Sequence, residues 1–200
     1  MSESNEDKSR ETMSLYKDYI QRLENVLNHF AWEPVHQLSL SLQRVWRTGN
    51  GVFLCGNGGS AGNANHLAND SNYGIDKNRG IGLKVEALSA NPSVLTCLAN
   101  DEGYETIFSQ QLKIKANSND VLIVLSGSGN SPNIINALGV GNEIGMKTFA
   151  ILGYSGGKCK QLAQYPIHFE IEDMQISEDL QLIVGHMCMQ WLAENGKGEV

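Results

Sequence analysis

The chain of 200 residues carries 15 Lys and Arg against 22 Asp and Glu, which gives a formal net charge of −7. This balance argues against a general nucleic-acid binder, because such proteins gather Lys and Arg on one face, and no run approaches the ~18 consecutive apolar residues of a membrane span. The first residues lack the basic and then apolar pattern of a signal peptide, and the four cysteines include no CxxC pair, as in reduced cytosolic proteins. We therefore expect a cytoplasmic protein that binds neither nucleic acid nor membranes.

The N-terminal part predicts a disordered start followed by two helices. Residues 1–12 are polar and charged, which is typical of disorder. Apolar residues then recur at intervals of three and four, as on one face of a helix; they are Tyr16, Tyr19, Ile20, Leu23, Leu27 and Phe30. A second helix is predicted from about Pro34 to Thr48, before the turn residues 48–51.

From residue 52 the pattern changes to short apolar runs separated by helical stretches. The runs predict buried strands because turn residues bound them; they are Val52–Cys55, Gly80–Leu88, Asp120–Leu125, Lys147–Leu152 and Ile167–Ile171. Helices are predicted from near Ser60, from Pro132 to about Gly145, and from Ile176 to Glu194. This alternation indicates an α/β fold with a doubly wound parallel sheet. We expect a single domain over residues 13–196 that includes the two N-terminal helices.

The loop after the third predicted strand carries the clearest chemical signal. Ser126, Ser128 and Ser131 offer hydroxyl donors, and the glycines between them let the backbone approach a ligand closely. Ser131 precedes a proline, a pair typical of a helix start, where free amides and the helix dipole attract an anion. A phosphate could be held here without Lys or Arg, although an ordinary Ser/Gly turn has the same composition. Neither GxGxxG nor GK[ST] is present, which disfavours nucleotide binding.

A second glycine-rich loop, residues 56–60, follows the first predicted strand, and the helix after it carries His66 and Asp70. A plain strand-to-helix turn would look the same as this loop. His66 and Asp70 are four residues apart and share a helix face, so they could bind a metal or act as acid and base, or simply face solvent.

The last predicted helix carries Glu178 and His186, eight residues apart and therefore on neighbouring sectors of the helix. The apolar neighbours of His186 are also typical of a core histidine. If this helix converges with the helix of His66 and Asp70, two imidazoles and two carboxylates would form a four-ligand site of the kind that zinc accepts. Spacing alone leaves that convergence open.

Taken in order, these motifs resemble the sugar isomerase (SIS) domain family, and within it the phosphoheptose isomerases. The similarity covers about Leu15 to Leu192. The matching segments are Cys55–Ala61 with His66, Ser93–Thr96 with Ala99–Asp101, Asp120–Ile123, Ser126–Pro132, Gly145–Lys147 and Leu152–Lys158. The ordered series is far more specific than either loop alone.

The resemblance implies a flavodoxin-like five-stranded parallel sheet and a homotetramer with active sites at subunit interfaces. It implies the isomerisation of sedoheptulose 7-phosphate to D-glycero-D-manno-heptose 7-phosphate, which feeds heptose synthesis for surface glycans. Carried over by motif, the residues expected to contact the sugar phosphate are Asn57, Gly58, Gly59, Ser60, Asn100, Asp101, Ser126, Gly127, Ser128, Ser131 and Glu178. The residues expected to hold one Zn²⁺ per subunit are His66, Asp70, Glu178 and His186, with Asp70 and His186 catalytic.

Several positions depart from the family pattern. Asp70 replaces a glutamate, Glu178 replaces a glutamine, and Ser126-Gly-Ser128 replaces Ser-Thr-Ser. An expected arginine is replaced around Gly74, and an expected aspartate is Gln175. These changes leave three interpretations: a divergent heptose phosphate isomerase, an isomerase of another sugar phosphate, or a non-catalytic SIS protein that binds phosphosugars or associates with an initiator protein. Because Asp70 and Glu178 keep metal-ligating oxygens, we favour the isomerase.

Overall fold

The computed structural model describes residues 3–76 and 80–196, with side chains from residue 12 onward. The chain divides into two compact units, residues 1–31 and 32–200. The described part of the first unit is built on helix α1 (Glu3–His29). The sequence predicts disorder to residue 12, whereas α1 begins at Glu3. The charged segment 3–12 contains neither Gly nor Pro, the two residues that most disfavour a helix.

The second unit alternates strands with helices, as the apolar runs predict. Its elements are α2 (Glu33–Thr48), β1 (Gly51–Cys55), α3 (Gly59–Tyr73), β2 (Lys84–Ala87), α4 (Pro92–Asp101), the 3-10 turn η1 (Tyr104–Thr106), α5 (Ser109–Lys115), β3 (Val121–Ser126), α6 (Pro132–Ile144), β4 (Lys147–Leu152), α7 (Gly157–Leu162), β5 (Tyr165–His168) and α8 (Met174–Asn195). Among the described residues, no helix is both long and apolar enough to cross a membrane.

The five strands form one parallel sheet in the order β2-β1-β3-β4-β5. This order is that of flavodoxin-like doubly wound folds, so the predicted fold class is confirmed. The central strand β3 is buried along its whole length, which suits a sheet that helices cover on both faces. All strands run the same way, so the loops after β1 and β3 meet at one edge of the sheet, beyond the carboxyl ends of the strands.

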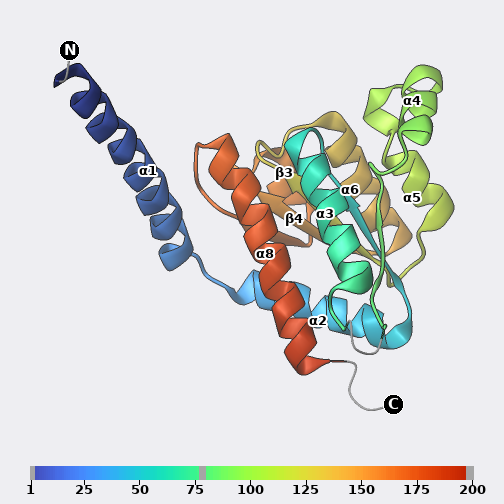
Figure 1. Ribbon diagram of the computed structural model, residues 1–200. Coiled ribbons are helices and arrows are strands. Elements are labelled where there is room, and N and C mark those ends of the chain that lie inside the picture. Colours follow the sequence, from blue (N-terminus) through green and yellow to red (C-terminus); the bar gives the residue numbers. More distant parts are fainter. Residues whose placement is uncertain (1–2, 77–79, 197–200) are drawn as a thin grey trace. The chain divides into compact units, whose positions relative to one another are not determined.

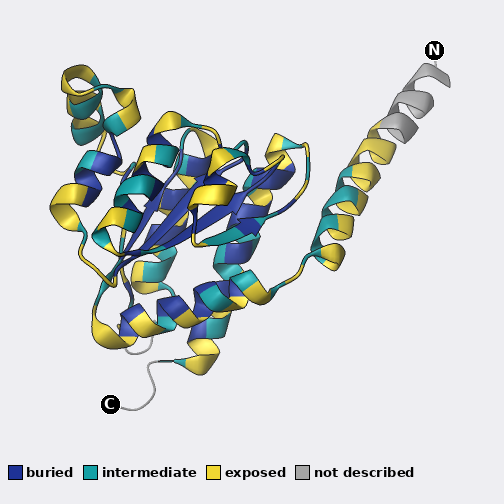
Figure 2. Ribbon diagram, turned by 180° about the vertical axis from the view of Figure 1, so that it is seen from behind, coloured by how far each residue is buried: buried dark blue, intermediate teal, exposed yellow. Residues whose placement is uncertain are grey.

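Successive residues of each strand alternate between two cores. Val52, Leu54 and Ile123 lie against α2, α3 and α8 on one face. Phe53 and Leu122 belong to the cluster on the other face, which α5, α6 and α7 cover. Figure 1 shows α3 and α8 side by side across one face, with α6 behind the sheet. In Figure 2 the strands and the inward sides of the flanking helices are the most buried parts of this unit.

Two strands differ by more than one residue from their predicted bounds, and two helices lie where none is predicted. Instead of Gly80–Leu88, β2 spans Lys84–Ala87, because Gly80 has a positive φ and Ile81 pairs with Asp76 in an antiparallel bridge. Instead of Ile167–Ile171, β5 spans Tyr165–His168, because a turn follows in which the Ile171 N–H donates to the Phe169 carbonyl. The unpredicted helices α4 and α5 lie between β2 and β3.

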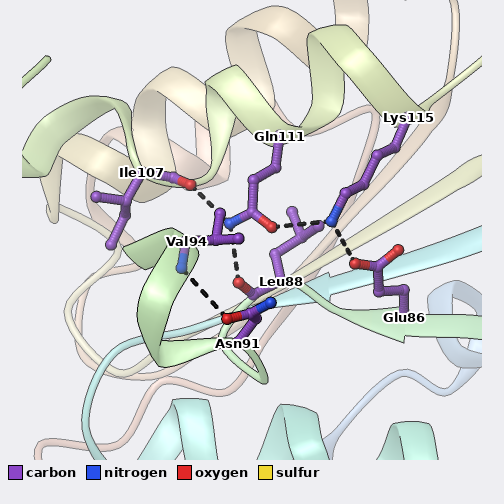
Figure 3. A network of polar contacts seen from close by, with 7 residues as sticks. All are labelled: Glu86, Leu88, Asn91, Val94, Ile107, Gln111 and Lys115. Atoms are coloured by element: carbon purple, nitrogen blue, oxygen red, sulfur yellow. Dashed lines mark hydrogen bonds and ion pairs between the residues drawn. The ribbon is translucent and has the colours of Figure 1, made fainter. Parts of the chain in front are cut away.

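A network of polar contacts joins α5 to β2, and Asn91 caps the first turn of α4 (Figure 3). The Gln111 amide, buried to 3% exposure, donates to the carbonyls of Leu88 and Ile107. Lys115 donates to Gln111 and pairs with Glu86 on β2. Asn91 accepts the first amides of α4 as its N-cap. The segment that carries Asn100 and Asp101 has no fully buried residue, but Leu95, Leu98 and Ala99 of α4 are partly buried and pack against the core.

Candidate active site

The two glycine-rich loops line one cavity of about 300 Å³ at the carboxyl edge of the sheet. Its walls are Asn57, Gly58, Gly59, Ser60, Leu125, Ser126, Gly127, Ser128, Ser131, Met174 and Glu178. All the residues predicted to contact a sugar phosphate are therefore brought together in this subunit except Asn100 and Asp101. We call this cavity the loop pocket. The N-termini of α3 and α6 begin at its wall, so free helix amides are close to any anion bound there.

The serines of the second loop keep their hydroxyl protons available to a ligand. Ser126 Oγ accepts from the Gly129 N–H at 3.1 Å, and Ser128 Oγ accepts from the Asn130 N–H at 3.3 Å. Ser131 is the N-cap of α6, but its side chain makes no capping bond. All three hydroxyls can thus donate to phosphate oxygens, two of them from oxygens that the backbone already holds in place.

Side chains from α8 approach closely at two glycines of the pocket. A Cβ at Gly59 would collide with the carboxylate of Glu178, and a Cβ at Gly127 would lie 2.6 Å from the Met174 sulfur. Glu178 is half-buried, and among the described residues its carboxylate has no hydrogen-bond or ion-pair partner. The pocket therefore carries one apolar group and one free carboxylate opposite the serine loop.

A second group of polar side chains lies farther along the same pair of helices. His66 and Asp70 on α3 meet His186 on α8, and their ligand atoms all lie within 4.8 Å of one another. The two helices come this close because Gly185 has no side chain where Leu67 packs against it. The sequence alone could not decide whether the helix of His66 and Asp70 lies next to the helix of His186. In the structure the two helices are in contact. Glu178 lies outside this group, so three of the four predicted ligands are adjacent in this subunit.

The geometry of the three residues fits a zinc ion. His66 Nε2 lies 3.0 Å from His186 Nε2, and Asp70 Oδ2 lies 3.3 Å and 3.7 Å from these two nitrogens. Tetrahedral ligands at zinc–nitrogen distances of ~2.0–2.1 Å stand roughly 3.4 Å apart. Two imidazoles and a carboxylate are also the donor set of catalytic zinc sites that keep a position open for substrate. The side chains of His66 and His186 are 48% and 45% exposed, so the group is open to substrate.

The His/Asp/His group lies farther along α3 and α8 than the loop pocket. Gly59 meets Glu178 at one level, and His66 meets His186 about two helical turns farther on. Seven residues of helix correspond to ~10 Å. This separation suits a ligand whose phosphate and reacting carbons are several atoms apart.

Two sets of supporting side chains were not singled out from the sequence. Asn57 and Asn133 exchange two amide hydrogen bonds of 2.8 and 2.9 Å, and the Tyr104 hydroxyl donates to Asn57 Oδ1 at 3.0 Å. Gln181 donates to the Ser60 hydroxyl and accepts from Asn63. These bonds tie the first loop to α6 and to α8. Their partners are 47 to 121 residues apart in the chain, so no local motif could indicate them.

Asn100 and Asp101 lie at the exposed C-terminal end of α4, apart from the residues that line the loop pocket. The Asn100 amide donates to Asp101 at 2.7 Å, and the Cys97 thiol donates to the same carboxylate at 3.5 Å. This hydrogen bond, with the charge of Asp101, raises the pKa of Cys97. Burial raises the pKa of Cys55, which ends β1 beside the first loop. Neither thiol is therefore activated as a nucleophile.

Comparison with known proteins places these features in a family. Residues 16–153 match the SIS domain family model. The phosphoheptose isomerase of Aliarcobacter butzleri is 36% identical over 158 residues, covering 79% of this chain and 83% of the relative. That of Clostridium acetobutylicum is 34% identical over 186 residues, covering 92% and 93%.

The chain belongs to the phosphoheptose isomerase family. The solved structure of the phosphoheptose isomerase from Neisseria gonorrhoeae agrees with this, with a TM-score of 0.85 at 25% identity, covering 94% of this chain and 99% of that one. The resemblance inferred from the ordered motifs is confirmed. The SIS match includes both pocket loops with His66 and Asp70, while Glu178 and His186 lie beyond its end at residue 153.

Proposed function

We propose that this phosphoheptose isomerase family member interconverts sedoheptulose 7-phosphate and D-glycero-D-manno-heptose 7-phosphate for the synthesis of heptose in surface glycans. One observation carries the proposal: a phosphate-type pocket and a His/Asp/His group lie at two levels of the same helix pair. The ligand would enter with its phosphate toward the serine loop and its carbonyl end toward His66, Asp70 and His186.

The roles of the residues follow from their chemistry. The hydroxyls of Ser126, Ser128 and Ser131, with the amides at the start of α6, would hold the phosphate. The Asp70 carboxylate would remove the proton on the carbon next to the carbonyl. His186 would then move a proton between the two oxygens of the resulting enediol. Glu178 faces the carbon chain and can accept hydrogen bonds from sugar hydroxyls.

Zinc is proposed as the cofactor, one per subunit, with His66, Asp70 and His186 as its ligands. When bound, zinc would polarise the substrate oxygens as a Lewis acid. Binding of a dication is favoured because Asp70 supplies a negative charge between two neutral imidazoles. This proposal rests on the distances among the three side chains.

We also propose a homotetramer in the cytoplasm. The first unit supports assembly, because α1 exposes Leu15, Tyr16 and Ile20 at 68%, 61% and 61%. Exposed apolar faces of this kind mark interaction surfaces. The open position of His66 and His186 leaves room for a neighbouring subunit to complete the site. The cytoplasmic location is in keeping with the cysteines, all of which are free.

The test is turnover of five-, six- and seven-carbon ketose phosphates, with and without added zinc, by the wild type and by Asp70→Asn and His186→Gln. We expect the seven-carbon substrate to be preferred and both variants to lose at least ~100-fold in kcat, since general acid–base catalysis contributes about that much. Bound zinc, measured by mass spectrometry, should fall in both variants. Glu194→Gln, which removes an exposed acid from the far end of α8, should match the wild type.

Two results would overturn parts of this proposal. Full activity in Asp70→Asn or His186→Gln would exclude the assigned roles. Binding of sugar phosphates without turnover of any of them would instead support a regulatory SIS protein.

A further inference from the structure

A second cavity, of about 210 Å³, lies at the amino ends of β3 and β4. Its polar walls are Ser41, Arg44, Asn119, Lys147 and Gln164. The sheet register pairs Val121 with Lys147, so both strands begin at this cavity. The loop pocket lies at the other end of β3, and the five steps between its six residues, at ~3.3 Å each, place about 17 Å between the two. We call this second cavity the amino-edge cavity.

The amino-edge cavity is lined by two cationic side chains and no acidic one. In the described part of the chain, neither Arg44 nor Lys147 has an ion-pair partner, and the Lys147 ammonium lies 5.9 Å from the centre of the Tyr165 ring. The adjacent acid, Asp120, is occupied elsewhere, since its carboxylate accepts from the backbone amides of Gly51 and Asn117 at 2.7 Å each. Arg44 is exposed and Lys147 is half-buried, so both cations are open to water and to any anion that enters the cavity.

Two uncharged groups in the same walls are also without partners. Ser41 is only 3% exposed, and its hydroxyl makes no hydrogen bond within the described residues, although it lines the cavity. Water or a ligand can reach this hydroxyl, because among the described residues the only buried side-chain N or O atom without a hydrogen-bond partner is Trp46 Nε1. Asn119 is exposed, and its φ of 76° is one that Asn adopts more readily than most residues. Its backbone N–H donates to the Gly145 carbonyl at 3.3 Å, and the residue lines the cavity.

We propose that the amino-edge cavity binds a phosphate dianion, either free or as the phosphomonoester end of a small metabolite. The forked Arg44 guanidinium suits two phosphate oxygens, and Lys147 adds a compact charge. Ser41 and Asn119 contribute an O–H and an N–H donor to the remaining oxygens. The cavity volume is below the ~300 Å³ at which pockets for drug-sized ligands begin. The site therefore recognises the phosphate group itself more than the rest of a large ligand.

This site is separate from the proposed isomerase chemistry. It lies at the opposite edge of the sheet and uses cationic side chains, whereas the loop pocket uses serines and helix amides. A failure of one proposal therefore leaves the other standing. A ligand in the amino-edge cavity would contact α2 and the first residues of β3 and β4 at once, because its donors come from all three segments.

Crystals of the purified protein soaked in low-millimolar selenate test the site directly, because selenate is a divalent oxyanion whose anomalous signal locates it. We expect an anomalous peak between Arg44 and Lys147 that disappears in Arg44→Gln/Lys147→Gln, while a peak at the serine loop stays. In calorimetry with inorganic phosphate, the affinity of this site should be about 100-fold or more weaker in the double variant. The measured number of phosphate sites per subunit should therefore fall by one. Glycerol phosphate, run in parallel, distinguishes a monoester from free phosphate.

The matched control is Arg47→Gln/Lys113→Gln, which removes the same two charges from exposed positions outside the cavity. It should keep the wild-type number of sites. The proposal is overturned if no peak appears in the cavity, or if the control loses affinity equally, since the effect would then be one of net charge. A third result would also overturn it. If the wild type binds no anion in the cavity, and light scattering shows a changed subunit number in the cavity variant alone, the two cations serve a contact between subunits instead.

Discussion

At the scale of single residues, Gly59 and Glu178 form the closest approach between the first loop and α8. The Glu178 carboxylate occupies the space that a side chain at Gly59 would take. Gly59→Ala should therefore displace the carboxylate. Because this is the free end of a flexible side chain, the change in stability should stay below ~1 kcal/mol, while kcat/KM for the sugar phosphate should fall clearly. Urea unfolding and steady-state kinetics measure the two effects.

Gly62 provides the control for this prediction. It lies in the same helix, and a Cβ there would meet nothing within 4 Å. Gly62→Ala should stabilise the protein by about 0.5–1 kcal/mol, since alanine favours the helix, and should leave activity unchanged. Equal losses of kcat/KM in Gly59→Ala and Gly62→Ala would show that α3 tolerates no added methyl group. The effect at Gly59 would then not depend on its contact with Glu178.

Cys97 allows a second test at this scale. It is exposed, yet its hydrogen bond to Asp101 and the charge of that carboxylate raise the pKa of the thiol. Because only the thiolate is nucleophilic, Cys97 should react slowly with iodoacetamide at neutral pH. Asp101→Asn should lower the pKa of Cys97 and speed alkylation several-fold, as followed by peptide mass spectrometry. Asn100→Asp, which adds a charge at the neighbouring position, should not speed it.

Much of the site could be predicted at the level of residues, and the rest depended on tertiary pairing. The serine loop, the glycine loop and the His66/Asp70 spacing are local, so the sequence displays them. The meeting of His66 with His186 joins residues 120 apart. Glu178 and His186 share one helix, but the parallel packing of α3 and α8 places them at two different levels of that interface, so the predicted set of four ligands is divided.

At the scale of elements, α4 and α5 show what periodicity cannot reveal. The strands have continuous apolar runs and were predicted within a few residues, whereas α4 buries none of its side chains. Only partly buried apolar residues, Leu95, Leu98 and Ala99, pack it against the core, Asn91 caps its first turn, and the Gln111 network in Figure 3 positions the neighbouring α5. Polar contacts of this kind leave no repeat in the sequence.

The Gln111 network therefore gives a prediction for α5 as a whole. Gln111→Ala should lower the free energy of unfolding by about 1–3 kcal/mol, because two amide hydrogen bonds are lost and the carbonyl of Leu88 is left buried without its side-chain donor. The neighbouring Gln110→Ala is the control and should change stability by less than ~0.5 kcal/mol. Both are measured by urea denaturation, and equal effects would show that the network contributes nothing specific.

At the scale of the whole molecule, the doubly wound sheet explains why the loops could be assigned to one site before any coordinates. Parallel strands bring their carboxyl ends to one edge, so two loops far apart in the sequence line the same pocket. The amino-edge cavity follows from the same geometry but could not be foreseen. Its donors come from α2, from Asn119 two residues before β3 and from the first residue of β4, and no motif links them.

Assembly is the remaining question at this scale, and α1 supplies the test. Leu15, Tyr16 and Ile20 are exposed on this helix, and the apolar spacing continues to Leu27. If other copies of the chain cover this face, Ile20→Glu/Leu27→Glu should lower the subunit number measured by light scattering. Activity should fall with it and recover at higher protein concentration, because the half-exposed His66 and His186 would then depend on a neighbouring subunit.

Gln21→Glu/Asn28→Glu adds the same charges one residue along the helix, about 100° around it, and should leave the oligomer intact. An unchanged subunit number in the Ile20→Glu/Leu27→Glu variant would exclude α1 as the assembly surface.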